Sequence, residues 1–290
     1  MPNKNYKAHL KFCGIEDKYS SWERSRIVIL PVSYDLTTSY KPGTSRGPMA
    51  IIDASRYMET YDDETGKEIY KSGIYTAEEI KSARPEPGEI IKKIEEEVSS
   101  ILKAKKFPVV LGGEHSVTLG PVKAFKEKFK DFSVLQLDAH RDLRDSFKGL
   151  KHSHACIARR ILEIASVTQV GIRSMSMEEA AREYKNLKTF FMKDMIKNED
   201  WLSEAIESLE SDKVYVTIDM DVFDPSIMPS VGTPEPGGMG WYEALALLKK
   251  LSQEKDVIGF DVVELSPMPG NISPDFLAAK LIYKFLSYIF

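Results

Sequence analysis

The sequence contains little cysteine, no long apolar run and no excess of basic residues. Its two cysteines, Cys13 and Cys156, form no CxxC pair, which argues against a disulfide framework or a structural zinc site. No segment approaches the roughly 20 apolar residues that span a bilayer, and the N-terminal segment has no apolar run of signal-peptide length. With 44 acidic against 40 basic residues, the net charge of −4 does not favour nucleic acid or anionic lipid. We therefore expect a soluble, cytoplasmic protein with a small-molecule partner.

Short aliphatic runs alternate with amphipathic segments of helical length, a pattern typical of βα units and a parallel sheet. The predicted strands cover residues 26–32, 107–112, 132–138, 167–173, 187–192, 213–219 and 257–265. The predicted helices cover residues 88–105, 116–129, 154–165, 177–184, 200–209, 241–251 and 274–288.

The chain of 290 residues could bury one substantial core or divide into two smaller domains. No linker, repeat or low-complexity tract interrupts the alternation, and the irregular stretch from about Arg56 to Arg84 is interpreted as a surface excursion. We therefore predict one three-layer α/β domain over residues 1–290, with a central parallel sheet. In such sheets ligands bind beyond the carboxyl ends of the strands, so the site is expected there.

Unusual residues follow four of the predicted strands. The strand from Phe107 runs into Gly112-Gly113-Glu114-His115, and the two glycines allow a sharp turn that aims the His115 imidazole across the sheet. Taken alone, a histidine after such a turn is more often a capping or satisfied polar residue than a metal ligand. The case for His115 as a ligand therefore depends on what the neighbouring strands carry.

Asp138, His140 and Asp142 follow the strand from Phe132 at every second position. If the backbone stays extended, this spacing puts two carboxylates and an imidazole on one side, where they can converge. The alternative is a solvated, charged loop. It is the less favoured interpretation, because these groups repel or perturb one another unless a cation or hydrogen bonds compensate.

Asp219 and Asp221 repeat the same spacing at the end of the strand from Lys213. A carboxylate at the end of a buried strand is costly unless it is hydrogen bonded or binds a metal, so this pair also favours a cation. The alternative is that Asp221, Asp224 or both cap the following turn. We adopt that interpretation for Asp224.

Counting charges indicates how many ions these groups would hold. Four carboxylates balance two divalent cations, and two imidazoles add neutral nitrogens. Six oxygen-rich ligands suit manganese or magnesium better than a single zinc, and the histidines favour manganese. The residues of this predicted site of two Mn²⁺ ions are His115, Asp138, His140, Asp142, Asp219 and Asp221.

Four segments resemble the signature motifs of the ureohydrolases, the family of arginases and agmatinases. They are GGEHS from Gly112, DAHRD from Asp138, DMDVFDP from Asp219 and GTPEPGG from Gly232. The resemblance spans the first strand to the last helix, and it implies a binuclear manganese centre on a single α/β domain. It also implies that one ion is held by His115, Asp138, Asp142 and Asp219 and the other by Asp138, His140, Asp219 and Asp221, so that Asp138 and Asp219 bridge.

The resemblance implies further roles beyond the metal ligands. Expelling an amine from a guanidino group requires a proton donor, and His154 in the segment HSHA is the candidate proton shuttle. Asp142 is the second candidate catalytic residue. Glu264, at the end of the last strand, is placed to bind a guanidinium through paired hydrogen bonds, and Thr233 is a second candidate contact. The alternatives are a helix-capping role for His154 and a solvated edge position for Glu264. His152 is interpreted as a surface-loop residue.

The substrate's other end is harder to predict. Arginase-like chains place a Ser and Asn cluster before the shuttle histidine, and residues 144–151 lack it and look agmatinase-like. The lead hypothesis is hydrolysis of agmatine to putrescine and urea, in polyamine biosynthesis. N1-aminopropylagmatine, guanidinobutyrate and arginine stay open as alternative substrates.

Two other classes of function stay open as well. One is a catalytically silent metal-binding regulator, because a fold alone does not prove activity. The other is a two-metal phosphoesterase or deacetylase, which the scarcity of basic residues in the motifs and the acidic Glu264 disfavour. Family members usually form trimers, hexamers or related assemblies, so a homo-oligomer is expected. The apolar C-terminal run LIYKFLSYIF is a possible contact, although its spacing favours a core helix.

Overall fold

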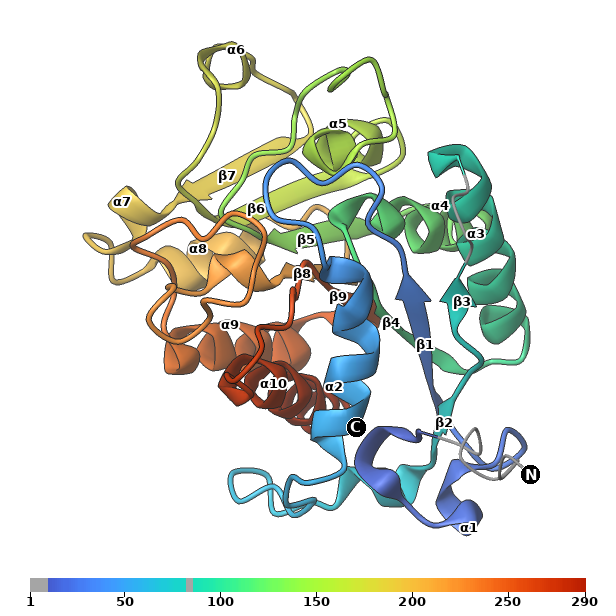
Figure 1. Ribbon diagram of the computed structural model, residues 1–290. Coiled ribbons are helices and arrows are strands. Elements are labelled where there is room, and N and C mark those ends of the chain that lie inside the picture. Colours follow the sequence, from blue (N-terminus) through green and yellow to red (C-terminus); the bar gives the residue numbers. More distant parts are fainter. Residues whose placement is uncertain (1–9, 82–85) are drawn as a thin grey trace.

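The computed structural model describes residues 10–81 and 86–290, and in it the predicted strands join into one parallel sheet of nine strands (Figure 1). The strand order is β2-β1-β4-β9-β8-β5-β6-β7, with β3 paired to β1. The strands are β1 (Ile27–Ser33), β2 (Ile74–Thr76), β3 (Ile80–Lys81), β4 (Phe107–Leu111), β5 (Ser133–Leu137), β6 (Ser166–Ile172), β7 (Leu187–Phe191), β8 (Lys213–Asp219) and β9 (Asp256–Val263).

Helices cover both faces of the sheet. One face carries α2 (Gly47–Ser55), α8 (Trp201–Glu207), α9 (Trp241–Glu254) and α10 (Ser273–Ile289), and the other carries α3 (Pro87–Lys103), α4 (Leu119–Lys128) and α5 (Ile157–Ile161). Single turns complete the fold at α1 (Asp17–Ser20), α6 (Met177–Ala180) and α7 (Met192–Met195), together with the 3-10 turns η1 (Phe12–Gly14), η2 (Thr44–Arg46), η3 (Ile69–Ser72), η4 (His115–Thr118), η5 (His154–Cys156) and η6 (Met220–Val222).

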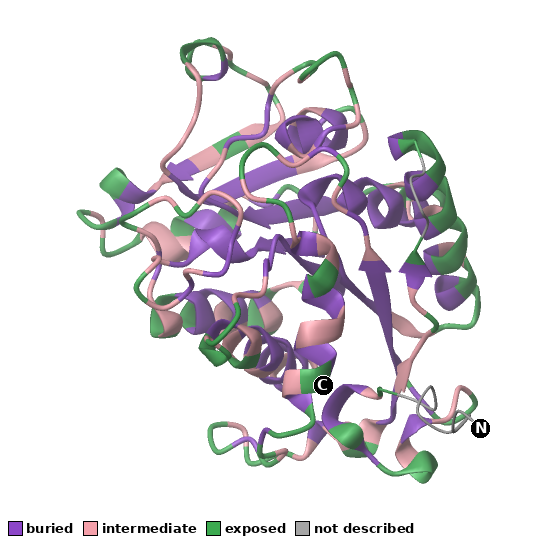
Figure 2. Ribbon diagram, in the orientation of Figure 1, coloured by how far each residue is buried: buried purple, intermediate pink, exposed green. Residues whose placement is uncertain are grey.

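The side chains of the strands supply two apolar cores, one on each face of the sheet. Along β1 the residues alternate between them: Ile27 and Ile29 join the core under α2 and α10, whereas Val28 and Leu30 join the core under α3 and α4. Figure 2 shows the strands buried along most of their length and the outer faces of the helices exposed. A sheet buried on both faces explains why its strands are almost uniformly apolar. The prediction of a three-layer α/β fold is confirmed.

The seven predicted strands are all present, whereas the prediction for residues 56–84 was incomplete. That stretch contains β2 and β3, which pair with β1 and bury Ile74 and Ile80. Strands of three and two residues are too short to show a period-two pattern. Arg84 belongs to residues 82–85, outside the described part of the chain, as do residues 1–9, on which the signal-peptide expectation partly rests.

Three helix predictions also need correction. The helix α2 was missed, and the predicted helix over residues 177–184 is the single turn α6. The predicted helix over residues 154–165 begins as η5 and ends at Ile161 in α5. The core interpretation of the C-terminal run is confirmed, because α10 buries ten residues. The single domain over residues 1–290 stays a prediction. Among the described residues, no helix is long and apolar enough to cross a bilayer.

The four strands that carry the candidate residues are neighbours in the sheet, in the order β4-β9-β8-β5. Their ends are level, since Leu111 pairs with Val262, Asp219 with Val263, and Leu137 with Ile218. The residues that follow these strands therefore emerge at one edge of the sheet, within reach of one another.

Close packing between the loops after β1 and β4 requires a glycine at position 113. The chain bends at Gly113 as expected, although neither Gly112 nor Gly113 has a positive φ. A Cβ on Gly113 would lie 2.0 Å from the carbonyl oxygen of Tyr34, which accepts a hydrogen bond from the Glu114 N–H at 2.8 Å. The glycine lets the loop after β4 lie directly against the loop after β1.

We predict that Gly113→Ala lowers the free energy of unfolding by roughly 3 kcal/mol, because the added methyl group overpacks a backbone contact that has no room to move. The denaturant midpoint measures this. Gly88→Ala is the matched control: nothing lies within 4 Å of the added Cβ in α3, so its stability is expected to be unchanged or higher. Equal midpoints for the two variants would contradict the packing argument.

Candidate metal centre

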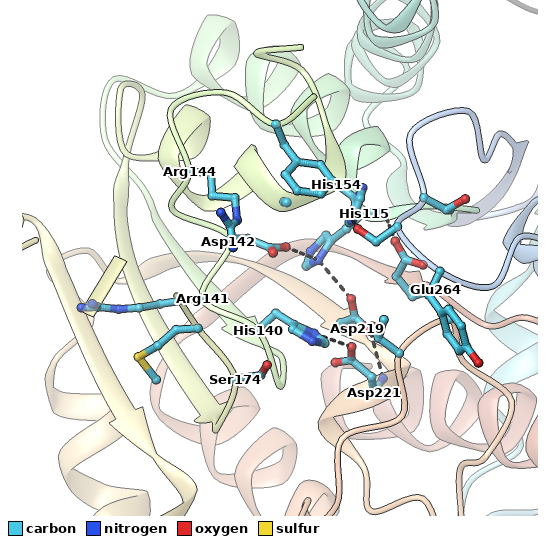
Figure 3. Close-up of a pocket in the computed structure, with 18 of the residues that line it drawn as sticks. His115, His140, Arg141, Asp142, Arg144, His154, Ser174, Asp219, Asp221 and Glu264 are labelled. Atoms are coloured by element: carbon cyan, nitrogen blue, oxygen red, sulfur yellow. Dashed lines mark hydrogen bonds and ion pairs between the residues drawn. The ribbon is translucent and has the colours of Figure 1, made fainter. Parts of the chain in front are cut away.

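A cavity of about 270 Å³ lies beyond the carboxyl ends of β4, β9, β8 and β5 (Figure 3). Most of the sequence-predicted site residues line it, and Asp138 lies beneath them, fully buried against His115. His152 is not among the lining residues. Those predicted residues that line the cavity are His115, His140, Asp142, His154, Asp219, Asp221, Thr233 and Glu264.

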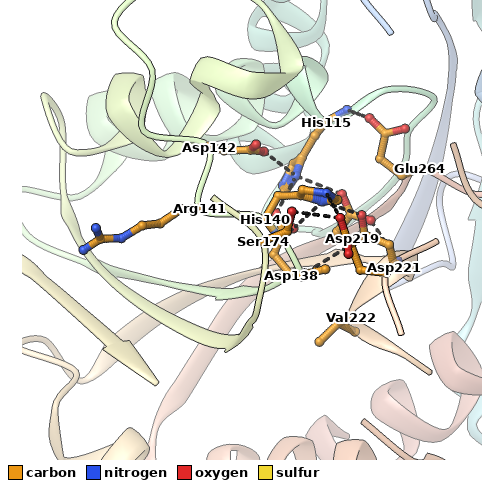
Figure 4. Close-up of polar contacts among 12 residues, drawn as sticks. His115, Asp138, His140, Arg141, Asp142, Ser174, Asp219, Asp221, Val222 and Glu264 are labelled. Carbon is orange, nitrogen blue, oxygen red and sulfur yellow. Dashed lines mark hydrogen bonds and ion pairs between the residues drawn. The ribbon is translucent and has the colours of Figure 1, made fainter. Parts of the chain in front are cut away.

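His115 is the centre of the first group of acidic side chains (Figure 4). Its Nδ1 lies 3.1 Å from Asp138 Oδ2, 3.2 Å from Asp219 Oδ2 and 3.5 Å from Asp142 Oδ2. The other ring nitrogen, Nε2, is 2.9 Å from Thr217 Oγ1. Nδ1 is buried and has no hydrogen-bond partner with good geometry. It is therefore a potential metal-ligand atom that faces three carboxylates.

His140 is the centre of a second group on the other side of Asp138. Its Nδ1 lies 2.8 Å from Asp221 Oδ2 and 3.8 Å from Asp138 Oδ1. Asp138 therefore turns one oxygen toward each imidazole, as a bridging carboxylate would. Asp219 turns its Oδ2 toward His115, and its Oδ1 accepts a hydrogen bond from the Asp221 N–H at 2.9 Å.

These groups fit divalent cations by geometry. Ligands on adjacent corners of an octahedron with metal bonds of about 2.1 Å lie about 3 Å apart, close to the distances of 3.1 and 3.2 Å around His115. Two sets of three residues bring their ligand atoms within 4.8 Å of one another: His115, Asp138 and Asp219, and Asp138, His140 and Asp221. Asp142 stands just outside the first set.

The electrostatics also fit cations. Burial, together with the neighbouring Asp221, raises the pKa of Asp138 and of Asp219, and burial raises the pKa of Asp142 to about 7. Burial also opposes ionisation of Asp221, but His140 beside it lowers its pKa to about 2. Carboxylates crowded together and buried in this way are stabilised as anions by positive charge and by hydrogen bonds.

The backbone after β5 differs from the extended chain that the alternation of Asp138, His140 and Asp142 predicted. The chain does not stay extended through Asp142, whose φ is +52°, and Glu264 has a φ of +65°. His140 N–H donates to Asp138 Oδ1 at 2.6 Å, which closes a tight turn. Left-handed backbone at non-glycine residues is strained and is often found where a side chain must be aimed at a functional site.

Two charged residues next to the candidate ligands have other partners. The Arg141 guanidinium points away from His140 and Asp142 (Figure 3). It donates to the carbonyl oxygen of Glu179 and lies over the Phe191 ring. Asp224 caps a turn, since its carboxylate accepts hydrogen bonds from the N–H groups of Ser226 and Gly237.

Arg173 ties the loops of the site together. Its Nη2 donates to the carbonyl oxygens of Asp221 at 2.6 Å, Glu235 at 2.8 Å and Phe223 at 3.3 Å. These carbonyls belong to the loop after β8 and to the GTPEPGG segment. One guanidinium therefore joins the loop of a candidate metal ligand to the segment that carries Thr233.

Glu264 lines the cavity from the end of β9. Its Oε1 accepts a hydrogen bond from the His115 N–H at 2.7 Å, which fixes the carboxylate beside the group of candidate ligands around His115. Burial, and then the nearby Glu114, raise the pKa of Glu264 to about 8. A cationic group that entered the cavity would therefore meet a buried carboxyl with no cationic side-chain partner among the described residues.

His154 faces the cavity from the start of η5 and makes no helix cap, so the capping interpretation is wrong. Its Nε2 lies 2.8 Å from Ser39 Oγ and its Nδ1 lies 3.2 Å from Thr37 Oγ1. Burial, and then the charges of His115 and His140, lower the pKa of His154 to about 4. The imidazole is therefore neutral near pH 7.

Sequence reasoning missed the loop after β1, which supplies Ser39 and Tyr40 to the cavity and Thr37 behind it. The signal was present, because this polar loop follows a strand that pairs with β4. It also missed Phe147, Ser174 and other lining residues, which nothing in their local sequence distinguishes from surface-loop residues.

Known proteins were compared with the chain by family model, sequence and structure. The model of the arginase family matches residues 25–287. An N(1)-aminopropylagmatine ureohydrolase from Synechocystis sp. is 40% identical over 99% of this chain and 96% of its own, and an agmatinase from Pyrococcus horikoshii is 38% identical over 88% and 89%. The crystal structure of the agmatine ureohydrolase of Thermoplasma volcanium superimposes with a TM-score of 0.89, at 32% identity, over 98% of this chain and 96% of its own.

We predict that divalent cations stabilise the metal-free protein, because they compensate the buried carboxylates and bind the folded state only. Mn²⁺ at about 100 times its dissociation constant is expected to add about 2.7 kcal/mol for each ion bound, which for a chain of this size raises the melting temperature by about 5 °C per ion. Thermal melts with MnCl₂ and with KCl of equal ionic strength test this. The same melting temperature in both salts would show that no cation site exists.

Proposed function

Because the chain belongs to the arginase family, we propose that it is a ureohydrolase that releases urea from agmatine or an agmatine-type amine. The observation that carries the proposal is that Glu264 lines the same cavity as the two groups of candidate metal ligands. A guanidinium held by this carboxylate would have its central carbon next to the metal centre. A phosphate would be repelled by the same carboxylate.

Two Mn²⁺ ions are proposed as the cofactor, held by His115, Asp138, His140, Asp142, Asp219 and Asp221. Two divalent cations in these groups would lower the pKa of a water molecule and so supply a nucleophile that neutral water lacks.

The remaining steps fall to the side chains. Glu264 binds and orients the planar guanidinium, with Thr233 as a second contact, and Asp142 accepts a hydrogen bond from the attacking water. The water oxygen bonds to the guanidino carbon, and the bond from that carbon to the alkyl-bearing nitrogen breaks. His154 takes a proton that the attacking water loses and passes it to that nitrogen, because an amine leaves well only when protonated. From agmatine the products are urea and putrescine, which gives the enzyme a role in polyamine biosynthesis.

Agmatine and N1-aminopropylagmatine are the two candidate substrates. The absence of a Ser and Asn cluster in residues 144–151 favours a substrate without a carboxylate, as both of these are. Aminopropylagmatine is favoured by the name of the 40% identical Synechocystis relative. Arginine and guanidinobutyrate carry a carboxylate. Of the Lys and Arg residues that line the cavity, Arg144 is paired with Glu179 at 3.7 Å and Arg141 donates to the carbonyl oxygen of Glu179, which leaves Lys41. A homo-oligomer stays a prediction.

We predict that the Mn²⁺-loaded protein releases urea from agmatine or aminopropylagmatine with a kcat/KM at least 100-fold above that for arginine. The physical reason is that an uncompensated carboxylate costs on the order of several kcal/mol to bury. A urea assay with each substrate measures it. Full metal occupancy with no urea from any guanidino compound would support the silent metal-binding alternative and refute the proposed function.

We predict that Asp138→Asn removes both metal ions, because one Asp138 oxygen faces each imidazole and the amide nitrogen cannot replace it as a ligand. Metal content after dialysis measures this. Asp224→Asn is the matched control, since Asp224 caps a turn five residues beyond Asp219 and is expected to leave two ions bound. Two ions retained in Asp138→Asn would refute the bridging role.

A further inference from the structure

A chain of hydrogen bonds runs from a buried carboxylate through a hydroxyl to His154. Thr37 lies in the loop after β1, and its side chain and main chain both bond to Glu114, which follows β4. Thr37 N lies 2.5 Å from Glu114 Oε2 and Thr37 Oγ1 lies 2.6 Å from Glu114 Oε1. Glu114 is fully buried and also accepts a hydrogen bond from Ser116 Oγ.

The direction of these bonds follows from which of the bonded groups carries a proton to donate. A threonine hydroxyl has one proton, and a carboxylate only accepts, so the Thr37 proton points to Glu114. Its lone pairs are then left for His154, whose main-chain N–H lies 3.1 Å away and whose Nδ1 lies 3.2 Å away. Three donors point at Glu114, two of them at Oε1, and they favour the accepting carboxylate against the burial that raises the pKa of Glu114 to about 7.

This direction determines where the imidazole carries its proton. Since Thr37 Oγ1 has only lone pairs to offer, the neutral ring bonds to it best with a proton on Nδ1. Nε2 is then unprotonated, and it lies 2.8 Å from Oγ of Ser39, an exposed residue that lines the cavity. Ser153 Oγ, 3.3 Å from Nδ1, is the other polar atom on the buried side of the ring.

We propose that Thr37 and Glu114 are positioning residues that hold His154 as the Nδ1–H tautomer, with an unprotonated Nε2 turned to Ser39 and the cavity. The inference rests on the proposed role of His154 as the proton shuttle. An unprotonated Nε2 can take a proton on the cavity side and return it to the leaving amine. The Nδ1–H bond to the Thr37–Glu114 pair stabilises the charged ring while Nε2 holds that proton. Neither residue touches the substrate.

The kinetic test replaces the Thr37 hydroxyl and retains its shape. Thr37→Val is expected to lower kcat about tenfold or more, with KM and metal content within twofold of the wild type, because partners of this kind typically contribute 10–100-fold. Thr37→Ser, which restores the hydroxyl, is expected to recover most of kcat. An unchanged kcat in Thr37→Val, or a loss that Thr37→Ser does not recover, would overturn the proposal.

Thr65→Val is a matched control, because Thr65 makes the same pair of bonds far from the site. Its N and Oγ1 both donate to Asp62 Oδ1, at 2.8 and 3.0 Å, and none of the histidines in the described part of the chain bonds to its hydroxyl. Its kcat is expected to be that of the wild type. A fall in kcat equal to that of Thr37→Val would trace both losses to general destabilisation and overturn the proposal.

A spectroscopic test reads the tautomer directly and needs no activity. The chain has five histidines, so ¹⁵N-labelled imidazoles in the Zn²⁺-loaded protein can be assigned with a His154→Gln variant. The wild type is expected to show His154 as Nδ1–H. In Glu114→Gln the amide donates to Thr37, the hydroxyl proton turns to His154, and the tautomer inverts to Nε2–H. A wild-type Nε2–H tautomer, or no change in Glu114→Gln, would overturn the proposal.

The two tests separate this inference from the proposed function. A wild type that releases no urea while its tautomer responds to Glu114→Gln would refute the ureohydrolase function and keep the positioning geometry. An active wild type whose tautomer and kcat ignore these substitutions would keep the function and refute the positioning role.

Discussion

The structure depends on burying four carboxylates at one edge of a parallel sheet. Asp138, Asp142, Asp219 and Asp221 are buried around two imidazoles. Buried charges of one sign destabilise a fold unless positive charge or hydrogen bonds offset them. The surrounding elements can be understood as the framework that holds these anions at ligand distances from one another.

That framework is made of ordinary sheet geometry and a few exceptional backbone positions. The order β4-β9-β8-β5 brings the four sequence segments side by side, and Gly113 lets the loop after β1 pack directly on the loop after β4. The left-handed residues Asp142 and Glu264 then aim single side chains. Regular structure positions the site to within a few ångströms, and the exceptions complete it.

The sequence predicted the seven main strands, because their apolar runs are long enough to show a pattern. The candidate ligands could be predicted too, since each follows such a run. What it could not reveal depends on contacts between distant segments. Nothing local distinguishes Thr37 from other loop threonines until Glu114, 77 residues away, is brought beside it. The left-handed backbone at Asp142 was hidden for the same reason, because alternation alone favoured extended chain.

Arg173 gives the site a mechanical property that its individual residues lack. One guanidinium donates to main-chain carbonyls of Asp221 and Glu235, in two loops with different tasks. A shift of the GTPEPGG segment to accommodate a bulkier molecule would therefore pull on the loop of a candidate metal ligand. In this chain, selectivity for the part of the substrate beyond its guanidino group is therefore coupled to the affinity for cations. A substitution that changes one is expected to change the other.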